Sequence, residues 1–300
     1  MVGLMPTVLQ TDLPGLTLLA RGKVRDVYRC EDLLLLVATD RVSAFDVVLS
    51  SPIPNKGRVL TELSAFWFQR LAGMVPNHLI STDIRNFPAS AQAHADVLAS
   101  RTMLCRPAER IAVECVARGY LTGSAWAEYA RHGSIGGLPF PAGMRANTRF
   151  AKPIFTQTTK EDSGHDLKLT YPQLVQRVGG STAAALRDTT LRLYAAASAI
   201  AAQRGIIIAD TKLEFGWIDG QLTWIDEAFT PDSSRFWTEA DYALDVAIPS
   251  FDKQPLRDYL SSSGWNLEPP PPDLPAEVVQ QTSHRYLELL ERLTRTDATA

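Results

Sequence analysis

The 300-residue sequence has few cysteines, no long apolar segment and almost no excess of charge of either sign. Its three cysteines, Cys30, Cys105 and Cys115, form no CxxC pair, so neither a disulfide framework nor a cysteine zinc site is indicated. Nowhere do ~18 apolar residues follow one another, so no membrane partner is expected. The formal net charge of −3 gives no electrostatic reason to expect nucleic acid as a partner.

The amino terminus also lacks the pattern of a secretory signal. No basic residue precedes its short apolar run, and Pro6 interrupts that run. The remaining composition, 45% hydrophobic and 21% charged residues, is ordinary for a globular protein. These features predict a cytoplasmic globular protein whose core needs no disulfide or structural metal.

The order of the expected elements indicates an α+β fold rather than a regular βαβ alternation. Strand patterns dominate the first third, beginning with 23–30 and 33–39 around the turn Glu31-Asp32. A helix capped by Thr61 should follow, then a helix over 124–133 capped by Ser124, and the clearest long helix covers 182–204. Residues 139–159, rich in glycine, proline and asparagine, are expected to form a long loop.

We predict three parts along the chain. Residues 1–112 form a strand-rich amino-terminal lobe, and residues 113–267 form a larger α+β lobe that carries the site. Residues 268–300 contain a stiff proline-rich spacer and then an amphipathic helix from about 275 to 293 that packs on the body.

A β-hairpin is the strongest local signal in the sequence. Asp219-Gly220 lies between alternating apolar runs, and a two-residue turn there pairs Ile218 with Gln221 and Phe215 with Trp224. The open end of this hairpin then gathers four acids and one lysine: Asp210, Lys212, Glu214, Asp226 and Glu227. Neighbouring carboxylates repel unless a cation lies between them, which predicts a magnesium site. The alternative is a solvated acidic end balanced by the lysine.

Three further segments have the residue types that bind phosphate. The segments are 22–25 (GKVR), 118–124 (RGYLTGS) and 230–235 (TPDSSR), which combine glycines, hydroxyls and guanidinium or ammonium groups. Each is also an ordinary turn or strand–helix connection, so none is decisive alone. His165, on the polar loop 155–166, is a possible base or merely a solvated side chain. No pattern of an activated nucleophile is present.

Taken in order, eight blocks of the sequence resemble the SAICAR (phosphoribosylaminoimidazole-succinocarboxamide) synthetase family. The blocks are GKVRDVY, ATDRVSAFD, NKGRVLT, ECVARGYLTGSAW, FTQTTKEDSGHD, IADTKLEFG, DEAFTPDSSRFW and SFDKQPLRDYL. The resemblance implies a two-lobe fold distantly like kinases and ATP-grasp ligases, with ATP between the lobes. It also implies an ATP-dependent ligase of purine biosynthesis that joins L-aspartate to carboxyaminoimidazole ribotide through an acyl phosphate.

The resemblance also implies roles for particular residues of this sequence. ATP would be bound by Gly22, Lys23, Val24, Arg25, Glu114 and Val116, the last two lining the adenine through backbone groups. Glu214 and Asp226 would hold Mg²⁺, while Asp210 and Lys212 would be catalytic and face the imidazole carboxylate and amine. The other substrates would be bound by Arg118, Ser124, Asp232, Ser234, Arg235, Lys253, Gln254 and Arg257.

Two other functions remain open at this point. A phosphotransferase of the same fold would use the same Asp/Glu pair on a small hydroxyl acceptor. A non-catalytic nucleotide-binding protein would have no need of the cluster of charges that the sequence retains. A monomer and a homodimer both fit the sequence.

Overall fold

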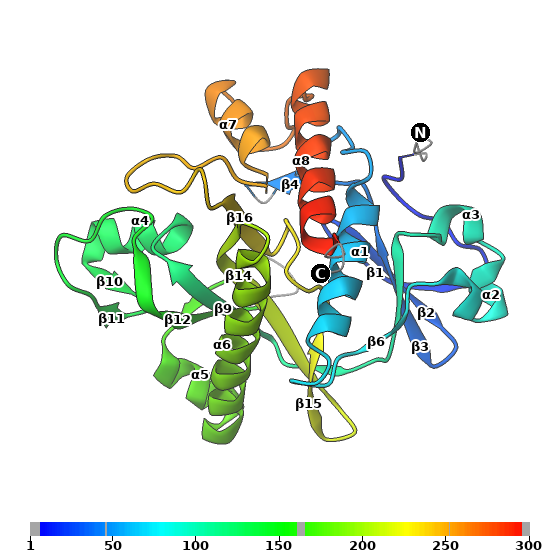
Figure 1. Cartoon of the computed structure of the whole chain (residues 1–300). Coiled ribbons are helices and arrows are strands. Elements are labelled where there is room, and N and C mark those ends of the chain that lie inside the picture. Colours follow the sequence, from blue (N-terminus) through cyan, green and yellow to red (C-terminus); the bar gives the residue numbers. More distant parts are fainter. Residues whose placement is uncertain (1–6, 46, 161–165, 252, 296–300) are drawn as a thin grey trace, which may run out of the picture.

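In the computed structural model, which describes residues 7–45, 47–160, 166–251 and 253–295, two main β-sheets stand side by side with helices around them (Figure 1). The mixture of strands and helices confirms the predicted α+β class. The first sheet has five antiparallel strands in the order β1 (Thr17–Arg21), β2 (Arg25–Cys30), β3 (Leu33–Ala38), β7 (Thr102–Cys105) and β6 (Leu79–Ser81).

The second sheet is built around one long strand, β14. Its main path is β13 (Lys168–Leu169), β12 (Arg149–Thr159), β9 (Val113–Tyr120), β14 (Ile206–Ile218) and β15 (Gln221–Ile225). β16 (Ser234–Thr238) and β8 (Glu109–Arg110) also pair with β14. Two short ribbons complete the strands, β4 (Ser43–Ala44) with β5 (Val47–Val48) and β10 (Ser134–Ile135) with β11 (Leu138–Pro139).

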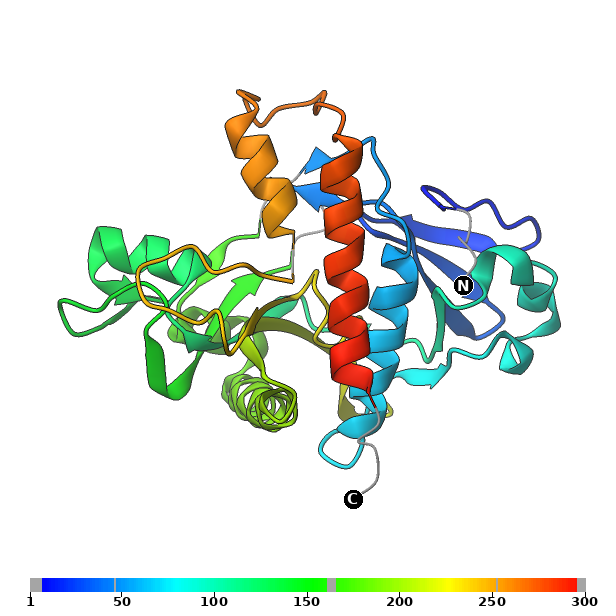
Figure 2. The same ribbon diagram turned by 45° about the horizontal axis from the view of Figure 1, so that its top comes forward.

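Two long helices lie against the sheets, and a third covers one of them. α6 (Gly180–Ala202) contacts β14, β9 and β12, and α1 (Lys56–Arg70) packs on β3 and β7. α8 (Ala276–Thr294) runs beside α1 in both views (Figures 1 and 2). The shorter helices are η1 (Ile84–Asn86), α2 (Ala89–Gln92), α3 (Ala95–Leu98), α4 (Gly123–His132), α5 (Tyr171–Val178) and α7 (Gln254–Ser262).

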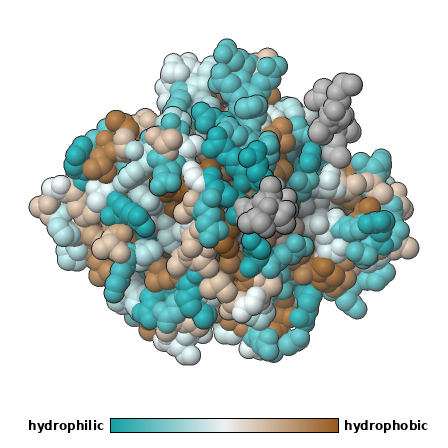
Figure 3. All heavy atoms as spheres, viewed as in Figure 1, coloured by the Kyte–Doolittle hydropathy of each residue, from teal (hydrophilic) through white to brown (hydrophobic). Residues whose placement is uncertain are grey.

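A single apolar core joins the two sheets behind the site. Trp67 of α1 and Trp224 of β15 are fully buried, and both contact the Phe229 ring, at centroid distances of 5.3 and 5.7 Å. Burying side chains of this size stabilises the fold by roughly 2–3 kcal/mol each. The outward side of α8 is hydrophilic, and apolar residues on this face occur in small groups (Figure 3). The structure has no helix among its described residues that is long and apolar enough to cross a membrane.

The predicted hairpin is confirmed with its register. Ile218 pairs with Gln221 and Phe215 with Trp224, and Asp219 and Gly220 both have positive φ, 51° and 73°. The first strand of the hairpin is the end of one continuous strand over 206–218. The predicted carboxyl-terminal helix is confirmed as α8. The division into three parts stays a prediction.

Two expectations were wrong. Thr61 is buried in the interior of α1, which begins at Lys56 after Asn55. Gly57 lies in the first turn of α1, where glycine is a poor helix former and so gives no signal of a helix start. Glycine is needed at this position because a Cβ would lie 2.2 Å from the Ala38 carbonyl oxygen. The expected loop at 139–159 contains the 11-residue strand β12, whose register with β9 shifts between Arg149 and Ile154.

The expected start of α4 also needs correction. Ser124 is not its cap: the helix begins at Gly123, the N-cap residue is Thr122, and no side chain caps the helix end. The Ser124 hydroxyl accepts a hydrogen bond from Arg118 instead. A hydroxyl that the sequence assigns to helix capping is therefore directed toward a charged side chain on β9.

Candidate functional site

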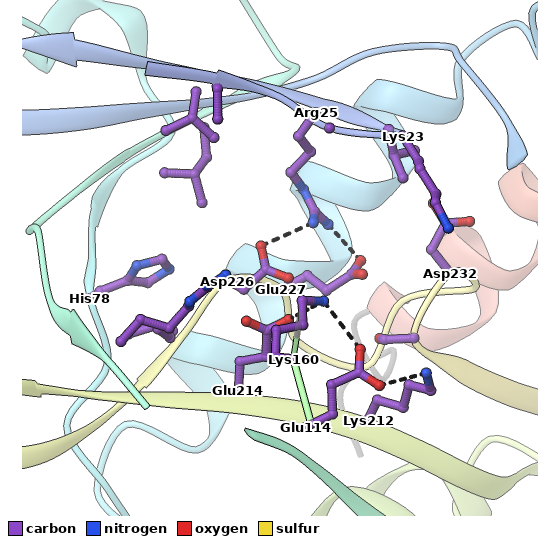
Figure 4. Close-up of a pocket in the computed structure, with 18 of the residues that line it drawn as sticks. Lys23, Arg25, His78, Glu114, Lys160, Lys212, Glu214, Asp226, Glu227 and Asp232 are labelled. Atoms are coloured by element: carbon purple, nitrogen blue, oxygen red, sulfur yellow. Dashed lines mark hydrogen bonds and ion pairs between the residues drawn. The ribbon is translucent and has the colours of Figure 1, made fainter. Parts of the chain in front are cut away.

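A cavity of about 710 Å³ lies between the two sheets. One wall comes from β1–β3 and the turn between β1 and β2, and the opposite wall comes from β9, the open end of the β14–β15 hairpin and the segment after it (Figure 4). Ten residues assigned to the site from the sequence line it: Gly22, Lys23, Val24, Arg25, Glu114, Lys212, Glu214, Asp226, Asp232 and Lys253. Residues more than 200 positions apart therefore meet at one cavity.

One part of the cavity wall is apolar and the rest is charged. Val27, Leu34 and Leu36 of the first sheet face the cavity together with Ala108 and Ile225. These side chains form a surface that suits a flat, uncharged ring. The charged part begins at Lys23 and Arg25, so the wall changes from apolar to polar within the first two strands.

Arg25 joins the two walls of the cavity. Its guanidinium lies 3.0 Å from Asp226 Oδ1 and 2.6 Å from Glu227 Oε2. Burial opposes the charge on Arg25, but the two carboxylates outweigh burial and raise its pKa. Asp226 directly follows β15 and has a φ of 64°, a left-handed conformation that is strained for a residue with a side chain.

Glu214 lies close to this pair and is short of positive charge. Its carboxylate is 2.8 Å from Lys160 Nζ. Burial and repulsion by Asp226 nevertheless raise the pKa of Glu214 to about 7, because Lys160 offsets only part of these two effects. Lys160 also contacts Glu114 at 3.1 Å, and Lys212 contacts Glu114 at 2.6 Å. Four carboxylates therefore share three cations at this end of the cavity.

The acidic end suits a magnesium ion. Mg²⁺ prefers hard oxygen ligands and usually takes one or two carboxylates, with waters and phosphate oxygens completing its shell. Glu214 and Asp226 provide two carboxylates whose mutual repulsion a cation would relieve. No group of three or more metal-ligating side chains occurs among the residues that the structure describes. A site here would thus depend on oxygens of a bound phosphate.

Asp210 belongs to a different cluster. It lies two residues before Lys212 on β14. Arg118 Nη1 lies 3.1 Å from Asp210 Oδ2, and Arg235 pairs with the same oxygen. Arg118 also donates to Ser124 Oγ at 3.2 Å. The Arg235 guanidinium packs against Gly123, where a Cβ would come within 2.5 Å of it. Two guanidiniums against one carboxylate leave net positive charge at the start of α4, which favours an anion.

Asp232 is the centre of a third cluster. Its Oδ2 lies 2.6 Å from Lys56 Nζ, and its Oδ1 lies 3.1 Å from Lys253 Nζ. Burial lowers the pKa of Lys56 to about 8. The two lysines hold the pKa of Asp232 well below its usual range even though burial acts in the opposite direction.

The turn that carries Lys23 is fixed from behind by a buried arginine. Arg41 donates to the Gly22 carbonyl oxygen at 2.9 Å and to Asp26 Oδ1 at 2.7 Å. Gly22 N in turn donates to the Arg25 carbonyl at 2.8 Å. A Cβ on Gly22 would meet only that carbonyl oxygen, at an ordinary 3.5 Å, so packing within the chain does not require glycine there.

Eight predicted residues are not among the described residues that line the cavity. Four of them form the positively charged cluster described above: Asp210, Arg118, Ser124 and Arg235. The other four are Val116, Ser234, Gln254 and Arg257. Val116 is 2% exposed and lies mid-sheet between β12 and β14, so its backbone groups do not face the cavity. The Ser234 hydroxyl donates to Thr211 Oγ1 at 2.8 Å. Gln254 begins α7 and donates to Asp258 at 2.6 Å, and Arg257 follows on the same helix. His165 lies outside the described residues.

Three residues that sequence reasoning did not assign are part of the site. Lys160 bridges Glu114 and Glu214, and Lys56 contacts Asp232. His78 lines the cavity 3.6 Å from Cys105 Sγ, and burial lowers its pKa to about 4, so the ring is neutral. Lys56 and Lys160 lie in the motif blocks, but their partners are 46 to 176 residues away. No local pattern encodes such contacts.

Comparisons with known proteins agree on one family. The family model for SAICAR synthetase matches residues 18–272. A phosphoribosylaminoimidazole-succinocarboxamide synthase from Pelobacter propionicus is 51% identical over 288 residues, covering 96% of this chain and 97% of the relative. A similar synthase from Trichlorobacter lovleyi is 50% identical over 287 residues, covering 95% and 97%.

Solved structures agree in fold. The SAICAR synthase from Saccharomyces cerevisiae, in complex with SAICAR, has a TM-score of 0.87 at 37% identity and covers 98% of this chain and 100% of its own. A SAICAR synthetase in complex with ADP has a TM-score of 0.67 at 21% identity and covers 94% of this chain and 99% of its own, a likeness of fold alone.

Proposed function

The chain belongs to the SAICAR synthetase family of ATP-dependent ligases of purine biosynthesis, and we propose that the cavity between its sheets is where the ligation occurs. In this reaction ATP, L-aspartate and carboxyaminoimidazole ribotide give SAICAR, ADP and phosphate. The observation that carries the proposal is the charge pattern of β14, which carries an excess of negative charge at Glu214 and an excess of positive charge around Asp210.

The nucleotide fits the side of the cavity formed by the first sheet. The apolar wall of Val27, Leu34 and Leu36 would face the adenine, in place of the predicted backbone groups of Val116. Lys23 and the backbone of Gly22 would cover the phosphates. Packing within the chain does not require glycine at position 22, which supports a role in letting a ligand approach the backbone closely. Arg25 already crosses to the acidic end, so the terminal phosphate would be directed toward Glu214 and Asp226.

Magnesium would be held by Glu214 and Asp226. Bound there, it would neutralise charge on the phosphate oxygens during phosphoryl transfer. The chain itself positions the two carboxylates in the absence of ligand, because Arg25 pairs with Asp226 and Lys160 pairs with Glu214.

The ribotide fits the positive end. Arg118 and Arg235 offer forked donors for its phosphate or carboxylate, and Ser124 and the start of α4 lie beside them. Asp210 holds both guanidiniums in place. The contacts of Ser234, Gln254 and Arg257 with substrate stay predictions.

The chemistry follows from a poor acyl donor. A carboxylate resists attack by an amine, so its oxygen is first phosphorylated by ATP, and the aspartate amine then displaces phosphate from the acyl phosphate. Lys212 lies between the two ends on β14, with its side chain about half exposed to the cavity. Its ammonium would stabilise negative charge on the phosphorylated carboxylate, and positioning and charge neutralisation supply most of such catalysis.

The test is ADP release with each substrate omitted in turn. Release that requires magnesium-ATP, carboxyaminoimidazole ribotide and L-aspartate together, with SAICAR identified by mass, is the expected result. Release that is independent of aspartate would favour the phosphotransferase alternative. A folded protein that binds ATP but releases no ADP under any combination would favour a non-catalytic role. The cytoplasmic location and the choice between monomer and homodimer stay predictions.

A further inference from the structure

Helix α8 reaches the wall of the cavity through one hydroxyl group. Tyr286 of α8 is fully buried, and its Oη donates to Asp232 Oδ1 at 3.2 Å. Asp232 lines the cavity, although it precedes Tyr286 by 54 residues. The carboxyl-terminal helix therefore contacts the site from behind its wall.

The Asp232 carboxylate is engaged by donors of the chain itself. Lys56 takes Oδ2, while Lys253 and Tyr286 share Oδ1. Of the two lysines, only Lys253 is among the described residues that line the cavity. Asp232 thus acts as a fixed anchor for the Lys253 ammonium, and a direct contact with substrate falls to Lys253.

The same helix touches the segments that carry both lysines. Ser283 Oγ donates to the Pro54 carbonyl oxygen at 2.7 Å, two residues before Lys56. The guanidiniums of Arg285 and Arg292 lie over the Phe251 ring, 5.7 and 5.5 Å from its centroid. Phe251 precedes Lys253 by two residues. Helix α8 thus contacts all three segments of the Asp232 cluster.

We propose that Tyr286 is a positioning residue for the reaction. By holding Asp232, it fixes the Lys253 ammonium against a carboxylate or phosphate oxygen of the ribotide or the aspartate. Tyr286 itself is buried away from the reacting atoms, so its effect passes through Asp232. The inference rests on the proposed ligase function, because it assigns the lysine to that reaction's anionic substrates.

The test is steady-state kinetics of Tyr286→Phe in the full chain, with each of the three substrates varied in turn. The variant keeps the ring and removes only the hydroxyl. We expect the KM of the ribotide, the aspartate or both to rise ~3- to 10-fold, as for the loss of one hydrogen bond of ordinary strength. The KM of ATP should rise by a smaller factor, because the apolar wall proposed for the adenine lies on β2 and β3, whereas Asp232 lies in the segment after β15.

Thr282→Val is the matched control. Thr282 is also fully buried on α8, but among the described residues its hydroxyl bonds only to the Val278 carbonyl within the helix, at 2.7 Å. The control should lower thermal stability as much as Tyr286→Phe or more, while leaving every KM unchanged. Ser283→Ala, which removes the contact with Pro54, should shift the same KM values as Tyr286→Phe by a smaller factor.

Three outcomes would overturn the inference: unchanged KM values in Tyr286→Phe, equal shifts in Thr282→Val, or a rise in the KM of ATP as large as the others. The last would make α8 a general brace between the lobes. An inactive wild-type protein would instead overturn the proposed function, so the two failures are distinguishable.

Discussion

The two ends of the site use the same residue types to opposite effect. Around Glu214, four carboxylates share three cations, and burial and repulsion raise the pKa of Glu214. Around Asp210, two guanidiniums share one carboxylate, and burial lowers the pKa of Arg118 although Asp210 opposes this effect. We propose that a cation completes the first end and an anion the second. The ratio of charges, more than the residue types, distinguishes a metal site from a phosphate site.

The strongest way to break this contrast is Asp226→Asn. The substitution removes one of the two carboxylates proposed for magnesium and breaks the Arg25–Asp226 ion pair, while the pair of Arg25 with Glu227 stays. We expect kcat for ADP release to fall at least ~100-fold, as for the loss of a charge that stabilises the transition state. Circular dichroism should remain as in the wild type. Retained activity with an unchanged magnesium dependence would refute the metal assignment.

Lys212→Ala tests the point on β14 between the two ends. Losing its ammonium should lower kcat ~10- to 100-fold, because charge on the acceptor carboxylate is no longer neutralised. Rate measurements at saturating ATP check this. Lys152→Ala, an exposed lysine on β12, serves as a control and should be near wild type. A change confined to the KM of ATP would place Lys212 outside the acceptor site.

Arg235→Gln should weaken the positive end alone. We expect the KM of the ribotide to rise ~10-fold or more through loss of a charge-assisted hydrogen bond, with the KM of ATP unchanged. Arg145→Gln removes an arginine from an exposed pair with Asp245 and provides the comparison. Equal effects of Arg235→Gln on both substrates would mean that the two ends are not separate binding regions.

The Asp232 cluster, in which burial lowers the pKa of Lys56, should make the stability of the fold depend on pH. Lys56 has a pKa of about 8 when folded against 10.5 for the free side chain, so the unfolded chain binds more protons between these values. The wild type should therefore gain stability relative to Lys56→Met from pH 8 to 10.5, by at most ~3 kcal/mol. Urea unfolding of both proteins at several pH values measures this. A constant difference would show that burial does not depress the lysine pKa.

The elements that sequence reasoning placed correctly depend on neighbours in the chain. The Asp219-Gly220 turn sets the register of β14 and β15 locally, and this register alone brings Glu214 near Asp226. The motif blocks identified ten of the cavity-lining residues because the family resemblance fixes their order. Hydrophobic period similarly located α6 and α8.

The features that were missed depend on distant partners. Lys56 contacts Asp232 176 residues away, and nothing near Lys56 marks it as buried. Val116 seemed available for adenine because a strand's neighbours cannot be read from its own residues. In β12, glycine and proline before the strand suggested a loop, whereas pairing with β9 stabilises an extended chain. Ser124 was assigned to a helix cap when its partner, Arg118, lies on the preceding strand.

The long strand β14 also has a metric consequence. Asp210, Lys212 and Glu214 occupy every second position of β14 and therefore lie on the same face of the strand. Four residue steps separate Asp210 at the positive end of the site from Glu214 at the acidic end. At ~3.3 Å per residue, the span between them is ~13 Å. The covalent geometry of the strand therefore sets the separation between Glu214, proposed to bind magnesium, and Asp210, which holds the arginines proposed to bind the ribotide. A shift of the first sheet relative to β14 would leave this separation unchanged.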